Sequence, residues 1–113
     1  PTLIFDEIDV GISGRIAQAV AQKMAIISRS HQLICVTHLP QIAAMADKHF
    51  TIEKYTDQER TYTTARVLPE KERQYELAKM IDGTGSSKLS LDHALELIRN
   101  SMSYKKTLYD TYK

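Results

Sequence analysis

The first half of the chain opens with a hydrophobic run that ends abruptly in two acids. Residues 2–5 are apolar or β-compatible, and Asp6 and Glu7 follow them directly. Such a run is typical of a buried strand, here with carboxylates at its carboxyl end. Gly11 and Gly14 come next and indicate a loop.

The following stretch predicts a helix and then a second buried strand. Residues 12–28 place apolar side chains three and four positions apart, with Ser13 suited to the N-cap. Residues 33–37 form the second apolar run, and His38 stands at its end. A strand, a helix and a strand of these lengths predict a right-handed crossover between parallel strands. The apolar face expected for the helix consists of Ile16, Val20, Met24 and Ile27.

The second half of the chain predicts a hairpin and further helices. Two β-rich runs, 50–55 and 61–68, flank a polar stretch, which favours an antiparallel hairpin. Three helices are expected in addition to the one at residues 12–28. The apolar face of the helix at residues 69–81 consists of Tyr75, Leu77, Ala78 and Ile81. The fold class is therefore α/β, with parallel strands and helical crossovers followed by a hairpin and two helices. The expected helices cover residues 39–46, 69–81 and 90–104, with a loop at 82–87 and a solvated polar tail at about 105–113.

Composition limits the choice of function. The 113 residues suffice for one small domain, and the formal charge of +1 gives no electrostatic footprint for nucleic acid. Cys35 is the single cysteine, which excludes an internal disulfide, and the apolar runs are too short to span a membrane. Because a strand pattern starts directly after Pro1, we expect the chain to be a piece of a larger protein.

The acidic pair predicts a phosphate-transfer site. Hydrolysis of ATP needs Mg²⁺, which prefers oxygen ligands, and a group that orients and deprotonates water. Asp6 suits the first task and Glu7 the second, while His38 at the end of a parallel neighbour would lie beside them and contact the γ-phosphate. The alternative is that the acids only mark a strand end and that His38 is an ordinary strand-end histidine.

Two segments carry a resemblance to a known family. Residues 3–14 read LIFDEIDVGISG and residues 35–44 read CVTHLPQIAA. Together they resemble the Walker B, D-loop and switch-histidine regions of the RecN family of bacterial SMC-like ATPases. Residues 68–81 are similar to an acidic helical region near the C-terminus of that family, so the resemblance covers essentially the whole chain.

The resemblance implies an ABC-type ATPase head that uses ATP and Mg²⁺. It also implies head-to-head homodimerisation with ATP, DNA binding, and double-strand-break repair in the bacterial cytoplasm, at the nucleoid. Asp6 would hold Mg²⁺ through water, and Glu7 would be the general base. Asp9 would act at the nucleotide site across the dimer interface, and His38 would be the switch histidine.

The phosphate-binding half of such a site is missing from this sequence. None of the four glycines fits the G-x-x-x-x-G-K-[ST] pattern, and no signature loop is present. We therefore expect the isolated chain, without its N-terminal head lobe, to be inactive, and either to self-associate through exposed strand edges or to persist as a reduced sheet. Two alternatives stay open: a head of another SMC-type ATPase, and a non-enzymatic interaction module.

Overall fold

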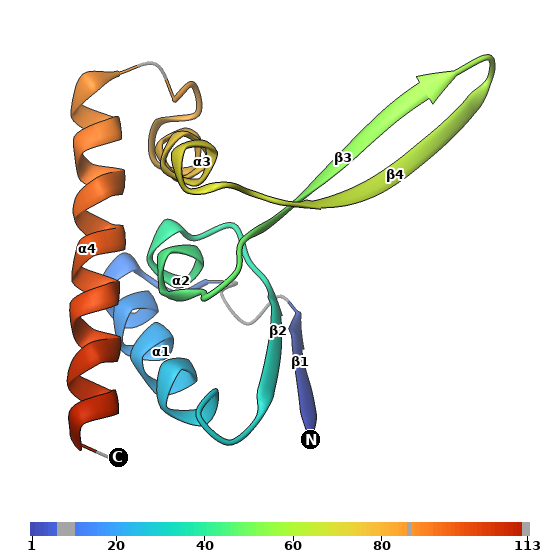
Figure 1. Cartoon of the computed structure of the whole chain (residues 1–113). Helices are drawn as coiled ribbons and strands as arrows, with labels where there is room; N and C mark the ends of the chain where they lie inside the picture. Colours follow the sequence, from blue (N-terminus) through green and yellow to red (C-terminus); the bar gives the residue numbers. More distant parts are fainter. Residues whose placement is uncertain (7–10, 86, 112–113) are drawn as a thin grey trace.

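The computed structural model describes residues 1–6, 11–85 and 87–111 and has a mixed α/β architecture. Within this part of the chain, two small sheets and four helices form (Figure 1). In chain order, the elements are β1 (Thr2–Asp6), α1 (Gly14–Ile27), β2 (Gln32–Val36), α2 (Pro40–Met45), β3 (Phe50–Asp57), β4 (Arg60–Val67), α3 (Glu70–Asp82) and α4 (Lys88–Thr111).

The predicted parallel pair of strands is confirmed. β1 and β2 pair in parallel, from Thr2 opposite Gln32 to Asp6 opposite Val36, and α1 connects them. Figure 1 shows α1 beside this two-stranded sheet, with α4 on the far side of α1. The sheet therefore has helices on one side, and the carboxyl ends of both strands lie at one edge.

The two faces of this sheet differ in burial. Phe5 and Cys35 are paired across the two strands and are half-buried, and Cys35 packs against the core cluster around α1. Ile4 is 71% exposed and Val36 is 59% exposed, and Ile34 between them is also exposed. Parallel sheets usually have both faces covered, so the exposure of this apolar face is unusual for such a sheet.

Helix α1 buries a different face from the one predicted. Ser13 is the N-cap, as expected, and its Oγ accepts a hydrogen bond of 3.4 Å from the Ile16 amide. However, Ile16 and Ile27 are exposed, while Val20 and Met24 are half-buried at the margin of the core. The physical reason is the close packing of α1 against its neighbours, which favours small side chains at the centre of the contact. The buried residues of α1 are Ala17, Ala21 and Ala25.

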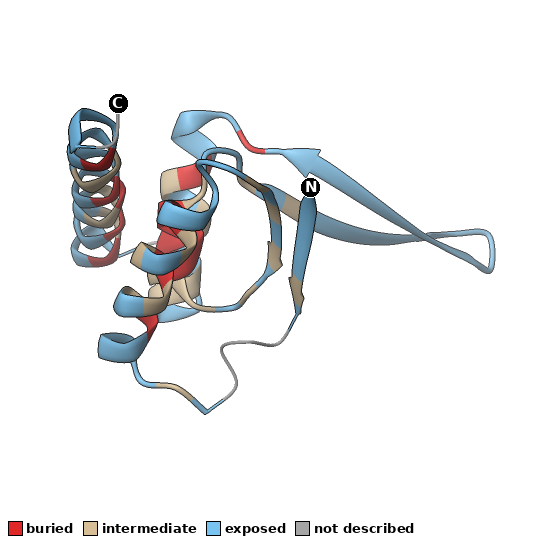
Figure 2. Cartoon of the chain, turned by 90° about the horizontal axis from the view of Figure 1, so that it is seen from below, coloured by how far each residue is buried: buried red, intermediate tan, exposed pale blue. Residues whose placement is uncertain are grey.

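Helix α2 lies at the centre of the helical layer and contacts α1, α3 and α4. Buried residues, red in Figure 2, lie along the facing surfaces of the helices. In α3, Leu77 and Ala78 are buried as predicted, Ile81 is half-buried, and Tyr75 is exposed, contrary to prediction. A charged residue, Arg73, is buried instead, because it donates to backbone carbonyls at the end of α2.

The predicted hairpin is confirmed and projects from the helices (Figure 1). Almost all of its residues are exposed, and its outer part is braced by Tyr55 and Tyr62, whose stacked rings lie 5.1 Å apart. Near its base, Arg66 pairs with Glu53 at 3.3 Å and with Glu72 of α3 at 2.7 Å.

The predicted tail differs in the structure, where α4 continues through it to Thr111. Two contacts explain the longer helix: Leu108 is buried in the core around α1, and Lys105 pairs with Asp47 at 2.9 Å. Arg29, just after α1, also donates to the Leu108 carbonyl. The segment is therefore polar along one face only and is fixed to the core along the other.

Candidate functional site

The carboxyl edge of the β1–β2 sheet brings together two of the predicted site residues. Asp6 is the last residue of β1 and pairs with Val36, and His38 follows Val36 by two residues. Both Asp6 and His38 are exposed. In open α/β sheets this edge is where ligands bind, so the two side chains stand where a bound ligand could reach them.

The other two predicted residues, Glu7 and Asp9, lie outside the described residues. Their roles therefore rest on the sequence, where Glu7 directly follows Asp6. The structure describes the strand that leads into this segment and, from residue 11 onward, the loop and helix that follow it.

The segments on either side of the edge are anchored to one core. Ile12, which precedes α1, and Leu39, which follows His38, both pack against the cluster of buried residues that α1 and α2 share. Thr37 fixes the turn after β2, because its Oγ accepts a 3.0 Å hydrogen bond from the Leu39 amide. Pro40 then starts α2 at a position where its missing N–H costs nothing. His38 is thus carried by a well-defined turn.

A direct contact also joins the two segments. Gly14 is the first residue of α1, and a Cβ built on it would lie 2.9 Å from Nε2 of Gln41 in the first turn of α2. Neither residue stands out in the sequence for this contact, because a single sequence gives no signal that a glutamine lies over a helix start.

Comparison with known proteins shows which proteins the chain is similar to. No protein-family model matches the chain. It is 45% identical over 104 residues to the DNA repair protein RecN of Halalkalibacterium halodurans, 43% over 106 residues to that of Bacillus subtilis, and 47% over 98 residues to that of Treponema pallidum. This chain is a RecN-like segment. The three matches cover 92%, 94% and 87% of it.

The RecN-like segment spans only 17–18% of the length of these relatives. It corresponds to their C-terminal part. Its similarity to RecN from such different bacteria does not favour a head of another SMC-type protein or an unrelated interaction module.

The chemistry of the edge of this RecN-like segment suits a hard cation. Asp6 presents carboxylate oxygens at an exposed strand end, which is the type of ligand that Mg²⁺ prefers, often through water. Across the described ranges, no group of three or more His, Cys, Asp or Glu side chains is arranged to hold a metal ion. In those same ranges, none of the helices is both long and apolar enough for a bilayer.

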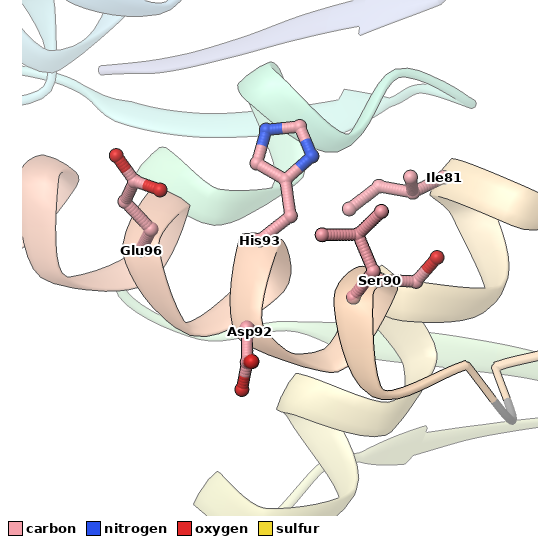
Figure 3. A pocket seen from close by; sticks show the side chains of 6 residues that line it. Ile81, Ser90, Asp92, His93 and Glu96 are labelled. Carbon is pink, nitrogen blue, oxygen red and sulfur yellow. The ribbon is translucent and has the colours of Figure 1, made fainter.

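A separate hollow of about 370 Å³ lies between the end of α3 and the start of α4 in the RecN-like segment (Figure 3). None of its lining residues comes from β1, β2 or the turns that follow them. Its lining residues are Ile81, Leu89, Ser90, Asp92, His93 and Glu96. The hollow is therefore distinct from the strand edge that carries Asp6 and His38.

Proposed function

We propose that this chain is the C-terminal part of the ATP-hydrolysing head of a RecN-like protein that acts in DNA double-strand-break repair and recombination. Its curated relatives are named DNA repair protein RecN. The observation that carries the proposal is the parallel pairing of β1 and β2. It supports a shared site for Asp6 and His38, since open α/β sheets bind ligands at the edge where parallel strands end.

Each site residue has a distinct role in the proposed ATPase. Asp6 would hold Mg²⁺ through water, and the ion would neutralise phosphate charge when ATP is bound. Glu7 would accept a proton from the attacking water, and its position directly after Asp6 supports this role. His38 would donate a hydrogen bond to the terminal phosphate. Asp9 would contact the nucleotide of a second head in an ATP-dependent homodimer.

The exposed face of the β1–β2 sheet supports the proposal that the chain is part of a larger head. Ile4, Ile34 and Val36 are apolar and exposed there, although parallel sheets are normally covered on both faces. We propose that an N-terminal head lobe covers this face and supplies the glycine-rich phosphate cradle. With that lobe, the head would belong to the P-loop NTPase fold, bind DNA, and work in the cytoplasm at the nucleoid.

Replacing the proposed general base tests this function. In the full-length protein that contains this chain, Glu7→Gln should lower the ATP hydrolysis rate at least about 100-fold, the lower end of what general-base catalysis contributes. ATP binding should persist, because the variant keeps the phosphate cradle. Glu96→Gln, an exposed carboxylate on α4, is the matched control and should hydrolyse ATP normally.

Two results would contradict the proposal. Unchanged ATPase activity in Glu7→Gln would point to the non-enzymatic interaction module. Turnover by the isolated chain, well above that of its Glu7→Gln variant, would contradict the proposed need for a second lobe.

A further inference from the structure

The β3–β4 hairpin has no neighbouring strand among the residues that the structure describes. It projects from the helices as a separate two-stranded sheet, and residues 52–67 are all exposed (Figure 1). An isolated two-stranded hairpin is only marginally stable in water, and a third strand or a packed helix is needed to stabilise it. A hairpin with two strands of eight residues therefore needs further structure beside it.

One face of the hairpin is apolar near its base. Phe50 pairs with Val67 there. The next pair on the same face, two residues along each strand, is Ile52 with Ala65. All four side chains are exposed. A contiguous apolar face in contact with water is typical of a surface that another segment covers.

The hydrogen-bond pattern of the hairpin determines which backbone groups point outward. Gln58 and Glu59 both have positive φ, 45° and 76°, as in the two-residue turn that closes a hairpin. At the other end, the Leu68 amide donates a 2.8 Å hydrogen bond to the His49 carbonyl. Hydrogen-bonded and non-hydrogen-bonded pairs alternate in between, so every second pair turns its N–H and C=O groups away from the partner strand. The outward-facing residues are Thr61, Thr63, Ala65 and Val67 on β4, and Phe50, Ile52, Lys54 and Thr56 on β3.

The two outer edges of the hairpin differ in charge. Proteins protect a free strand edge against pairing with charged side chains, lysine above all, or with proline or a bulge. β3 has Glu53 and Lys54 in its middle, and Lys54 is one of its outward-facing residues. β4 has no charge between Arg60 and Arg66, no proline, and an unbroken register. Residues 61–65 are threonine, tyrosine and alanine, a composition that favours strand pairing. The unprotected edge is therefore that of β4.

We propose that β4 accepts a third strand, which is supplied by the part of the RecN-like polypeptide that precedes this chain. The chain spans only 17–18% of the length of its relatives and corresponds to their C-terminal part, so most of a relative's length precedes the matched segment. The N-terminus and the hairpin both lie on the side of the molecule away from α4 (Figure 1, Figure 2). A preceding segment thus enters the molecule on the side of the hairpin.

A strand from the same polypeptide fits this edge better than a second copy does. It would cover the edge at every protein concentration, whereas a second copy would leave the edge open in dilute solution and prone to aggregation. The inference rests on the proposed function, in which this chain belongs to a larger head. It adds the edge at which the rest of that head continues the hairpin sheet.

Hydrogen exchange in the full-length protein tests the third strand without any need for ATP turnover. The amides of Thr61, Thr63 and Ala65 point away from β3, and a strand beside β4 would accept their hydrogen bonds. After correction for intrinsic rates, they should exchange at least about 100-fold more slowly than the amides of Ile52 and Lys54, which point outward from the other edge.

Proline substitution in the full-length protein provides a matched pair of variants. Thr63 and Lys54 are cross-strand partners whose amides both point outward, so proline at either position spares the hydrogen bonds between β3 and β4. Thr63→Pro removes a bond to the third strand and should speed the exchange of the Thr61 and Ala65 amides at least about tenfold. Lys54→Pro should leave their exchange within about twofold of that in the unsubstituted protein, because the β3 edge bonds no strand.

Three results would overturn the proposal. The first is fast exchange at Thr61, Thr63 and Ala65 in the purified full-length protein. The second is slow exchange there that is lost on dilution, which would assign the strand to a second copy. The third is an equal effect of Thr63→Pro and Lys54→Pro on that exchange. If Thr63→Pro does not fold, the exchange of the unsubstituted protein at several concentrations decides alone.

The proposed ATPase and the third strand fail in distinguishable ways. Loss of ATP hydrolysis in Glu7→Gln together with fast exchange along β4 would refute only the third strand. Normal hydrolysis in Glu7→Gln together with slow, concentration-independent exchange along β4 would refute the ATPase and support the third strand.

Discussion

The guanidinium Nη2 of Arg73 donates a 2.6 Å hydrogen bond to the carbonyl oxygen of Ala46, just past the end of α2. The same nitrogen lies 2.9 Å from the Ala44 carbonyl and 3.2 Å from the Ala43 carbonyl. Carbonyls at a helix end lack partners within the helix and carry partial negative charge. Arg73 of α3 thus caps α2 and ties it to the rest of the helical layer.

Removing this cap should destabilise the fold. We predict that Arg73→Met lowers the free energy of unfolding by about 2–3 kcal/mol, since it removes charged hydrogen bonds and takes from the Ala44 carbonyl the donor that Arg73 supplies. Urea denaturation measures the change. Arg99→Met, an exposed arginine of α4, should stay within about 0.5 kcal/mol of the parent chain. Equal losses in the two variants would contradict a capping role for Arg73.

His49, near Arg73, should make stability depend on pH. Burial lowers the pKa of His49 below its usual 6.5, and the positive charge of Arg73 lowers it further. The unfolded state therefore binds more protons than the folded state between the lowered pKa and 6.5, so stability rises with pH across this window. The contribution of neutral His49 to the free energy of unfolding should be fully present above pH 6.5 and should decline as the pH falls below that value.

The His49→Gln variant separates this effect from other acid titrations. Urea denaturation at a series of pH values from about 5 to 8 should show a smaller slope in the variant than in the parent chain. The prediction would be contradicted if the stability of the unsubstituted chain increased as the pH fell through this range. Such a result would require a pKa of His49 above 6.5 and not below it.

Local patterns were sufficient to predict the elements and the placement of Asp6 and His38 at one edge of the β1–β2 sheet. The apolar runs that end at Asp6 and near His38, separated by one helix, predict parallel strands, and parallel strands place both residues at one edge. Ser13 and Pro40 predict the starts of α1 and α2 for equally local reasons, a side-chain cap and a fixed φ.

The remaining features depend on tertiary contacts that no local pattern encodes. Arg73 would be assigned to the surface by composition, yet it is buried because a helix end needs a donor. Lys105 belongs to a polar stretch, but its pairing with Asp47 and the burial of Leu108 extend α4. No sequence pattern indicates that the Gln41 side chain lies beside Gly14.

The two glycines of the loop after α3 should differ in their tolerance of a methyl group. Gly83 and Gly85 both have positive φ, +85° and +71°. A Cβ on Gly83 meets nothing within 4 Å, whereas one on Gly85 would lie 2.5 Å from Cγ of Lys79 and 3.3 Å from the Tyr75 carbonyl oxygen. Backbone strain alone costs about 1–2 kcal/mol, so Gly83→Ala should lose that amount.

The Gly85→Ala variant should lose more than Gly83→Ala, by about 1 kcal/mol or more, because overpacking against Tyr75 and Lys79 adds to the strain. Gly83→Ala is thus the matched control for the cost of backbone strain. Thermal or urea unfolding of both variants measures the difference between their losses of stability. Equal losses would mean that the Lys79 side chain moves away freely and that the loop has room.

The open face of the β1–β2 sheet should govern the solution behaviour of the isolated chain. Ile4 and Ile34 are exposed on adjacent parallel strands, and an apolar sheet face of this kind promotes association. We predict that the isolated chain self-associates at high concentration and that Ile4→Thr with Ile34→Thr shifts it toward monomer in light scattering. Ile16→Thr, an exposed isoleucine on α1, should leave association unchanged. A parent chain that stays monomeric at high concentration would contradict the prediction and weaken the case that another lobe covers this face.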